Sequence, residues 1–518
     1  MPIGRMIFYL DKYKYSMRCA LDRIAKETQD RTWAEVPRRV VPKLYVVAAH
    51  LMFAGIDYSL ASQICGALHT GTATAVKDAD AWRVCVDESH HDKAYGALEL
   101  LGVAKPRAVD FAILVFHWIR NPSATPKAVK QIAESVFVKK RLIAYQYRQD
   151  LAMELAPHIP QPPHLIPEDW QFAWGGRAEV TLLLNALSLR CIYHIVAVHF
   201  GSGVHRLRGG GESSIVLVLS REQLIADLEL MSSLDRTPIR AFVDSLTWGR
   251  GTNTPDPALQ PLIPIGSGVF AIPCVHLLSS SQERNLLSLM ARTQTQAFDA
   301  QSQLFEHDMI TSLLASSRPA GVELRSNVRL RIDGCEEEID MLLIDERGRR
   351  LLVCELRWML GPGDPREVQN RKKECLKKVG QVRRKVERVS TRAGVAAARA
   401  LGCKVEGDSI DGWVTTGVVL IDGFGGTRSP DAKYPIMPVA LFERALGEAS
   451  SLEALALWCE GLSWLPREGK HFSIITMEIA LADSTPLILQ GADAPDSARN
   501  FLSDAVASLS ERDHAPTQ

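Results

Sequence analysis

A predicted hairpin in the C-terminal half of the chain would bring two carboxylates face to face. Residues 336–345 and 350–358 are predicted to be β-strands joined through a turn centred on Arg347–Gly348. The register of that hairpin places Asp340 opposite Glu355. Directly opposed residues have Cβ atoms about 4.5 to 5.5 Å apart, so the two carboxylates would converge on a gap the size of a cation.

Two carboxylates at that separation repel each other unless one is protonated or a cation lies between them. Mg²⁺ takes oxygen ligands from one or two carboxylates and completes its shell with water and phosphate. Such an ion lowers the pKa of an attacking water and neutralises charge on a phosphodiester. The pair therefore predicts a Mg²⁺ or Mn²⁺ site for phosphodiester hydrolysis. In the alternative interpretation the charges only form ion pairs at a sheet end, with Glu338 opposite Arg357 and Asp340 beside a basic group.

The elements around the pair follow a definite order. A helix over 297–317 precedes three strands, a long basic helix over 365–400 and a fourth strand. This order, with the strings E-I-D at Glu338–Asp340 and E-L-R at Glu355–Arg357, resembles the PD-(D/E)xK nuclease superfamily, which includes many restriction endonucleases, Holliday-junction resolvases and phage-defence nucleases. The resemblance covers residues 296–445 and implies a restriction-endonuclease-like α/β domain with a mixed central sheet.

The resemblance also implies roles for individual side chains. Asp340 and Glu355 would bind the metal ion, Glu306 on the first helix would add a ligand, and Gln381 on the basic helix matches a glutamine of many members. Arg357 departs from the pattern, since it stands where the family has a catalytic lysine. An arginine keeps the positive charge but is not deprotonated in proteins, so Arg357 is expected to stabilise charge rather than act as a general base.

The helix after the third strand is strongly basic. Between Arg366 and Arg388 it has ten Lys and Arg residues against three Glu, an excess that favours contact with a phosphate backbone. Because some family members supply the lysine from a neighbouring element, we expect Lys378 or Gln381 to reach the carboxylates. The residues expected to bind nucleic acid are Lys372, Lys373, Lys377, Lys378, Arg383, Arg384 and Lys385.

The rest of the chain divides by pattern and composition. One helical pattern runs unbroken over 126–156, and a proline-dense stretch from Pro157 to Pro167 marks a boundary after it. The fold class predicted is therefore multidomain α+β. The predicted regions are a mostly helical domain (1–155), a mixed helix and strand region (156–295), the nuclease-like domain (296–450) and a C-terminal helix, strand and polar tail (451–518).

Composition excludes several classes of protein. With 518 residues, 46% of them hydrophobic, the chain is neither disordered nor a small disulfide-stapled protein. Its 60 Lys and Arg balance 60 Asp and Glu, so attraction to nucleic acid has to come from local patches. Ten cysteines without a C-x-x-C pair, and no signal peptide, indicate reduced thiols in a cytoplasmic protein. The apolar stretch Val180–Phe200 contains Asn185, Arg190 and His194 and is expected to be a core helix rather than a membrane span.

These features predict a divalent-metal-dependent nuclease that acts on DNA rather than RNA and has no membrane partner. A role in bacterial phage defence or DNA processing follows only by analogy with the fold. Two alternatives stay open. One is a catalytically inactive nuclease-like subunit that binds nucleic acid or a partner protein in a larger complex, and the other is a scaffold whose helical half acts in a complex. A protein partner or a homo-oligomer is compatible with each.

Overall fold

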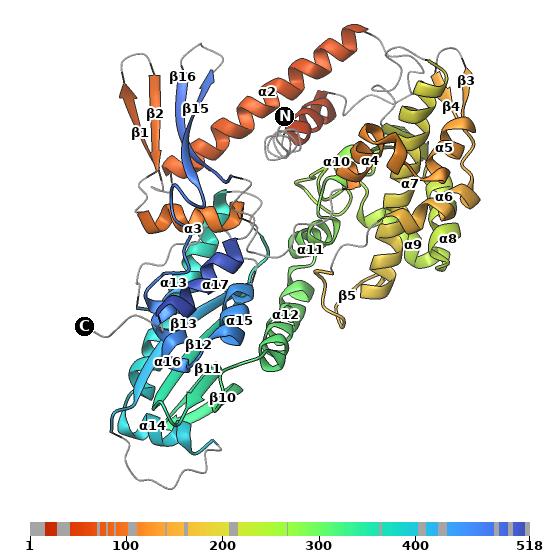
Figure 1. Ribbon diagram of the computed structural model, residues 1–518. Coiled ribbons are helices and arrows are strands. Elements are labelled where there is room, and N and C mark those ends of the chain that lie inside the picture. Colours follow the sequence, from red (N-terminus) through yellow and green to blue (C-terminus); the bar gives the residue numbers. More distant parts are fainter. Residues whose placement is uncertain are drawn as a thin grey trace. The chain divides into compact units, whose positions relative to one another are not determined.

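The chain passes three times between two folded units (Figure 1). Unit 1 consists of residues 1–61 and 107–301, and unit 2 of residues 62–106 and 302–518. α2 (Pro42–His69) and α12 (Thr295–Ala315) each belong in part to both units. The computed structural model describes residues 16–27, 42–69, 73–78, 81–86, 90–101, 111–139, 142–159, 164–206, 216–266, 268–361, 365–401, 411–422, 433–480, 486–495 and 501–512.

The predicted fold class is confirmed, because the chain is α+β with a helical N-terminal region and a mixed five-stranded sheet in its C-terminal part. The two units differ from the four regions expected from the sequence. The prolines between Pro157 and Pro167 do not separate units, since α6 (Gln149–Leu155) and α7 (Arg177–Val204) pack together across them within unit 1. Both helices have buried apolar faces that need a common core.

Unit 1 is built around α7, which is buried along most of its length. Glu179 accepts a hydrogen bond from the backbone N–H of Gly176 at 2.9 Å and so caps the start of this helix. By length and composition α7 is apolar enough to cross a membrane, but 78% of its most apolar window is buried inside the protein, as expected of a core helix. The stretch Val46–His69 of α2 passes the same test with 6% of its window buried.

The remaining helices and strands of unit 1 surround α7 or follow it along the chain. They are α4 (Phe111–Arg120), η1 (Pro122–Ala124), α5 (Lys127–Glu134), β3 (Phe137–Lys139), β4 (Leu142–Ala144), η2 (Ala156–His158), β5 (Gln171–Phe172), β6 (Gly175–Gly176), β7 (Val216–Ser220), α8 (Arg221–Ser232), α9 (Arg236–Ser245), β8 (Ile263–Pro264), β9 (Val269–Pro273), α10 (Cys274–Leu278) and α11 (Gln282–Thr293).

The helical pattern predicted over 126–156 is wrong in its middle. There α5 and α6 are separated by the antiparallel hairpin of β3 and β4. The run Val136-Phe137-Val138 consists of β-branched and aromatic residues, which favour strands. Local composition therefore overrides the three- and four-residue spacing of apolar residues.

Unit 2 contains a five-stranded mixed sheet in the order β10-β11-β12-β13-β14. β10, β11 and β12 are antiparallel neighbours, whereas β13 is parallel to β12 and β14 is parallel to β13. The hairpin has the predicted register, with Met341 opposite Cys354 and Asp345 opposite Arg350. The strands are β10 (Val322–Ile332), β11 (Cys335–Asp345), β12 (Arg350–Trp358), β13 (Val414–Asp422) and β14 (Ile436–Pro438).

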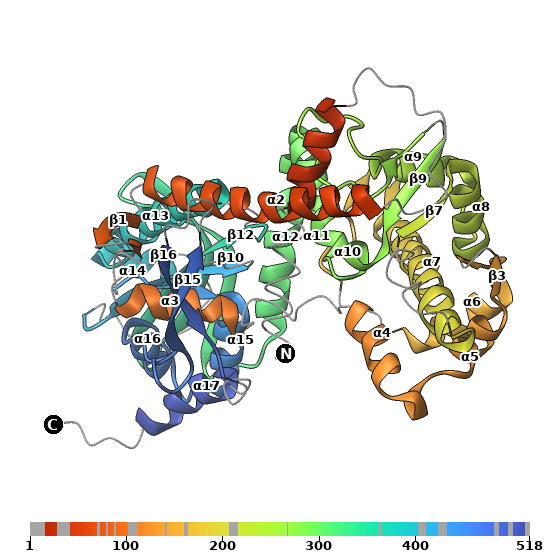
Figure 2. The same ribbon diagram turned by 90° about the horizontal axis from the view of Figure 1, so that it is seen from above.

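Helices cover both faces of this sheet (Figure 2). α13 (Pro365–Val389), which connects β12 to β13, lies with α14 (Arg392–Arg399) on one face. α15 (Val439–Glu448), α16 (Leu452–Glu460) and α17 (Phe501–Arg512) lie on the other face. A sheet covered on both sides explains why most side chains of β11 and β12 are buried.

α13 is shorter than the basic helix expected over 365–400 and packs very closely on the sheet. It ends at Val389, and Thr391 starts α14 by accepting a hydrogen bond from the backbone N–H of Gly394 at 3.1 Å. Gly417 of β13 permits the close approach, since an added Cβ would lie 2.7 Å from a methyl group of Val386. The helix is therefore fixed over β12 and β13.

A second sheet of unit 2 joins strands from distant parts of the chain (Figure 1). Its order is β1-β2-β16-β15, and β2 pairs in parallel with β16. α3 (His90–Leu100) follows β2 and packs Tyr95 edge-on against Trp464, with 5.6 Å between the ring centroids. The strands are β1 (Ala73–Asp78), β2 (Ala81–Val86), β15 (Ser473–Ala480) and β16 (Pro486–Asp493).

The polar tail expected at the C-terminus is wrong for the residues that the structure describes there. β16 and α17 follow β15 in that region. α17 buries Phe501, Ala505 and Leu509 in the core that also contains the five-stranded sheet. Half of the residues of α17 are apolar, and their burial depends on the surface of unit 2 against which the helix packs.

Candidate functional site

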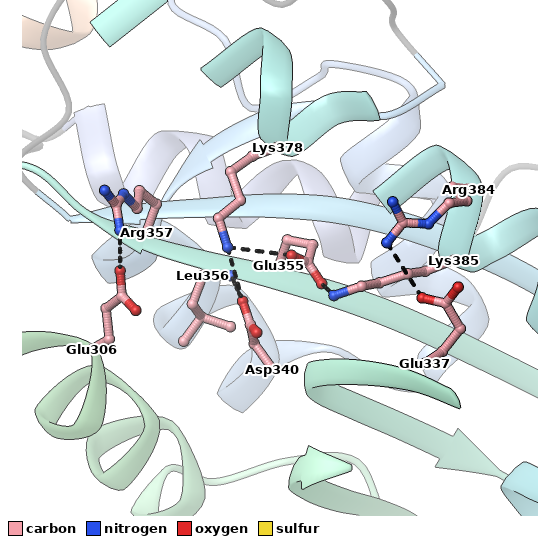
Figure 3. A network of polar contacts seen from close by, with 9 residues as sticks. All are labelled: Glu306, Glu337, Asp340, Glu355, Leu356, Arg357, Lys378, Arg384 and Lys385. Atoms are coloured by element: carbon pink, nitrogen blue, oxygen red, sulfur yellow. Dashed lines mark hydrogen bonds and ion pairs between the residues drawn. The ribbon is translucent and has the colours of Figure 1, made fainter. Parts of the chain in front are cut away.

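The carboxylates of Asp340 and Glu355 lie close to the same ammonium group, that of Lys378 (Figure 3). The pairing of β11 with β12 ends at Met341 and Cys354, the residues next to the two carboxylates. The Oδ2 atom of Asp340 accepts a hydrogen bond from the backbone N–H of Leu356 at 2.8 Å. Leu356 lies beyond the last residue of β12 that pairs with β11, and its N–H therefore bonds to the Asp340 side chain instead of to β11. This hydrogen bond holds the Asp340 carboxylate beside Glu355.

Lys378 of α13 reaches both carboxylates, as expected from the sequence. Its Nζ atom lies 3.3 Å from Oδ2 of Asp340 and 3.3 Å from Oε2 of Glu355. The side chains of Lys378 and Asp340 are 17% and 27% exposed, whereas that of Glu355 is 1% exposed. An ammonium group therefore lies where the sequence predicts a metal ion.

Lys385 contacts the other oxygen of Glu355. Its ammonium group pairs with Oε1, and both side chains are buried. Lys378 and Lys385 are seven residues apart on α13, so they lie on one face of the helix. The sequence-based assignment of Lys385 to a nucleic-acid surface is wrong, since a buried ammonium cannot contact a backbone in solution. Lys378 likewise lies within the carboxylate cluster and not on the outer surface.

Burial and neighbouring charges shift the pKa of two groups in this cluster, Glu355 and Lys378. Burial and the neighbouring Asp340 carboxylate raise the pKa of Glu355 above the ordinary value of 4.5, although Lys378 and Lys385 act in the opposite direction. Burial alone would lower the pKa of Lys378, but Asp340 and Glu355 outweigh it and raise that pKa above 10.5. Lys378 is therefore a cation at neutral pH.

Arg357 and Glu306 form a separate ion pair beside this cluster. The Nη1 atom of Arg357 lies 3.1 Å from Oε1 of Glu306, which is on α12. The expected pairing of Arg357 with Glu338 is wrong, because Glu338 lies 3.8 Å from Arg329 at the surface. Glu306 thus neutralises Arg357 instead of joining Asp340 as a third carboxylate, and the metal-ligand role expected for it has no support in this arrangement.

Two polar atoms near the cluster are buried without a hydrogen-bond partner among the described residues. They are Nε of Arg357, a donor, and Oε1 of Gln381, an acceptor. Gln381 lies on α13 three residues after Lys378 and four before Lys385, so it shares their helix face. Buried polar groups are nearly always satisfied by protein, water or ion, and orphaned ones mark places where a ligand or solvent completes the site.

The basic residues of α13 have different environments. Arg384 and Arg388 both pair with Glu337 of β11, which is 3% exposed, and Arg383 lies over the ring of Tyr434 at 5.8 Å. Sequence reasoning missed Glu337, although its position two residues before Ile339 places it on a predicted apolar face, where a carboxylate needs a cation.

Three lysines of α13 carry no ion pair among the described residues. Lys373 and Lys377 are exposed, and Lys372 is half-buried. Lys373 and Lys377 are four residues apart and therefore lie side by side on the helix surface. Of the seven residues expected to bind nucleic acid, these two lysines are exposed and have no ion pair among the described residues, whereas the exposed Arg384 pairs with Glu337 and the exposed Arg383 lies over the ring of Tyr434.

The carboxylates of Asp340 and Glu355 are the type of ligand that a small divalent cation prefers. Mg²⁺ needs one or two carboxylates and takes the rest of its shell from water and phosphate, so Asp340 and Glu355 suffice. The orphaned Oε1 of Gln381 is an acceptor that a bound water could fill. No group of three or more His, Cys, Asp and Glu side chains suited to a metal ion occurs in the described part of the chain. These residues therefore do not form a site in which protein side chains supply every metal ligand.

No protein-family model, curated protein or solved structure matches this chain. The interpretation of the site consequently rests on its own geometry and charges.

Proposed function

We propose that this protein is a divalent-metal-dependent nuclease that hydrolyses phosphodiester bonds of DNA. The convergence of Asp340, Glu355 and Lys378 at the end of the β11–β12 hairpin carries the proposal. Two carboxylates can bind the cation, and an ammonium group beside them can stabilise the charge of a phosphate.

The surroundings of the cluster support a relationship to the PD-(D/E)xK superfamily. α12, three antiparallel strands, α13 and the parallel strand β13 follow the order that the resemblance implies. In this proposal Lys378 replaces, from the neighbouring helix, the lysine that is missing at Arg357. The side chain of Lys378 extends from α13 to Glu355 near the end of β12. Its ammonium group therefore supplies, beside the carboxylates, the positive charge that a lysine at position 357 would supply.

Each side chain has a distinct role in the proposed reaction. Asp340 and Glu355 would hold Mg²⁺ or Mn²⁺, which supplies an acidified water and neutralises charge on the phosphodiester. Lys378 holds a phosphate oxygen near the carboxylates. Arg357 contributes a permanent positive charge at the end of β12, and its orphaned Nε is a donor for a phosphate oxygen. Gln381 orients a water through its unsatisfied Oε1.

The nucleic-acid backbone would follow the exposed side of α13. Lys373 and Lys377 offer two adjacent charges without a carboxylate partner among the described residues, and contacts of this kind position a duplex without reading its sequence. They lie on the helix that also carries Lys378, so substrate charge and the cluster are brought together.

The test is cleavage of single- and double-stranded DNA and RNA with Mg²⁺ or Mn²⁺. Wild-type protein should cut DNA only with metal, and Asp340→Asn and Lys378→Met should each reduce the rate by about 10²-fold or more. Glu338→Gln is the matched control, since Glu338 is two residues before Asp340 on the same strand and 62% exposed. It should keep full activity. Wild-type rates in Asp340→Asn would overturn the proposal.

A second function is favoured by the full neutralisation of the cluster. Two ammonium groups already balance the two carboxylates, so the cluster is complete as a set of ion pairs. In that case the protein is an inactive nuclease-like subunit that binds nucleic acid or a protein partner. Binding of DNA without cleavage, together with no uptake of Mn²⁺ with or without DNA, would select this function.

A further inference from the structure

We infer that Lys378 occupies the cation position between Asp340 and Glu355 in the free protein, and that a phosphate of nucleic acid draws it away, so that metal and nucleic acid bind cooperatively. This inference rests on the proposed function and adds to it the regulation of the same site.

The two lysines of the cluster differ in how firmly they are held (Figure 3). The side chain of Lys385 is 8% exposed, and its ammonium group pairs with Oε1 of Glu355. That of Lys378 is 17% exposed, and both of its contacts measure 3.3 Å, longer than the usual 2.7 to 2.9 Å of charge-assisted hydrogen bonds. Lys378 is therefore the cation that leaves, while Lys385 continues to hold Glu355.

The charge balance of the cluster requires Lys378 to leave when a divalent cation binds. With both lysines in place the cluster has two positive and two negative groups and is neutral. A divalent cation added to it would leave two uncompensated positive charges beside a carboxylate that is 1% exposed. Once the ammonium group of Lys378 has left, one excess positive charge remains, which the negative charge of a phosphate offsets.

A phosphate bound at the exposed surface of α13 would offer the ammonium group of Lys378 a new partner. Lys377 is exposed and has no ion-pair partner among the described residues, and it precedes Lys378 on α13 by one residue, about 100° around the helix axis. A lysine side chain has a flexible four-carbon stem, and its ammonium group can turn from carboxylate to phosphate without movement of α13. The free protein would therefore bind metal weakly, and the nucleic-acid complex tightly.

Cooperative binding of this kind is reciprocal. If DNA tightens Mn²⁺ binding, Mn²⁺ tightens DNA binding by the same factor, which for such coupling is about 5- to 150-fold. The experiment measures Mn²⁺ binding to the full chain by electron paramagnetic resonance, with and without a short DNA duplex whose phosphorothioate linkages resist hydrolysis and which a gel shows to remain intact in the sample. The proteins are the wild type, Lys378→Met, Lys378→Arg and, as a control, Lys130→Met on α5.

Wild-type protein should bind Mn²⁺ about 5- to 150-fold more tightly with DNA than without it. Lys378→Met should bind Mn²⁺ tightly without DNA and lose the effect of DNA, because no ammonium group competes. Lys378→Arg keeps a permanent positive charge and should bind Mn²⁺ weakly without DNA. Lys130→Met should match the wild type.

The two possible failures are distinguishable. If Asp340→Asn abolishes Mn²⁺ binding but Lys378→Met leaves the affinity unchanged, the metal site stands and the inference about Lys378 is overturned. If no protein binds Mn²⁺ in any condition, the proposed function fails together with the inference. Should Lys378→Met not fold, the wild type alone decides, since equal Mn²⁺ affinity with and without DNA overturns the inference.

Discussion

The ammonium group of Lys385 contacts Oε1 of Glu355 across 30 residues of sequence, and both side chains are buried. The pair joins α13 to β12 at the position where Lys378 reaches the other oxygen of the same carboxylate. Removing either charge from such a pair leaves the other in a medium of low polarity, which is costly. The pair thus fixes the rotation of α13 over the sheet and, with it, the placement of Lys378.

Lys385→Met should destabilise the protein by about 3 kcal/mol, because Glu355 loses a buried partner. Lys377→Met, eight residues earlier on the same helix, removes an exposed lysine and should change stability by less than about 0.5 kcal/mol. Urea denaturation of both variants measures the difference. Equal stabilities would show that the buried pair contributes nothing to the placement of α13.

Two glycines of unit 2 should respond in opposite ways to alanine. Gly380 is exposed in the interior of α13, and an added Cβ there would meet nothing within 4 Å, so Gly380→Ala should stabilise the protein by about 1 kcal/mol. Gly417→Ala would place a Cβ 2.7 Å from Val386 and should destabilise it by about 1 to 3 kcal/mol. Thermal denaturation of both variants measures the direction of each stability change. Stabilisation by Gly417→Ala would contradict the close packing of α13.

The salt dependence of DNA binding should identify the lysines that face the backbone. Lys373→Ala and Lys377→Ala should each reduce the slope of log K against log salt by about 1. Arg384→Ala should have a smaller effect on that slope, since its guanidinium group is 3.4 Å from the buried Glu337. Fluorescence anisotropy at several salt concentrations gives these slopes. Three equal slopes would mean that the ion pair with Glu337 does not restrain Arg384.

Arg357 should act by charge and not by proton transfer. Arg357→Ala should lower kcat about 10²-fold with little change in KM, whereas Arg357→Lys should keep most of the activity. The measurement is steady-state cleavage of DNA with Mg²⁺. A loss in Arg357→Lys as large as that in Arg357→Ala would instead assign the effect to the guanidinium group itself, whose Nη1 lies 3.1 Å from Oε1 of Glu306.

His471 should make stability depend on pH. Burial and Lys470 lower the pKa of His471 below 6.5, against the opposing effect of Asp504, while its Nδ1 accepts the backbone N–H of Arg467 at 2.9 Å. The folded protein therefore binds this proton less readily than the unfolded chain, and stability is lost as the pH falls from 6.5 through the lower pKa of His471 in the folded protein. Thermal denaturation between about pH 5 and 8 should show this loss in the wild type and not in His471→Asn. The same pH dependence in both proteins would assign it to other groups.

The sequence by itself determined the register of the β11–β12 hairpin and the face of α13 that meets it. A short turn fixes the register of a hairpin, so the pairing of Met341 with Cys354, and hence the neighbourhood of Asp340 and Glu355, followed from counting residues. The apolar stripe of α13 and its spacing also brought Lys378 to the site side of the helix. These are short-range relationships that backbone geometry sets.

Only the tertiary structure decided the contacts that depend on distant chain segments. β2 pairs with β16, and Glu306 on α12 takes Arg357 as its partner, because the packing of unit 2 brings these elements together. Whether Lys385 is a surface charge or a buried counter-ion likewise depends on how deeply α13 approaches the sheet, which Gly417 on another strand permits. Charge type and helical spacing are encoded locally, but burial and choice of partner are properties of the packed core.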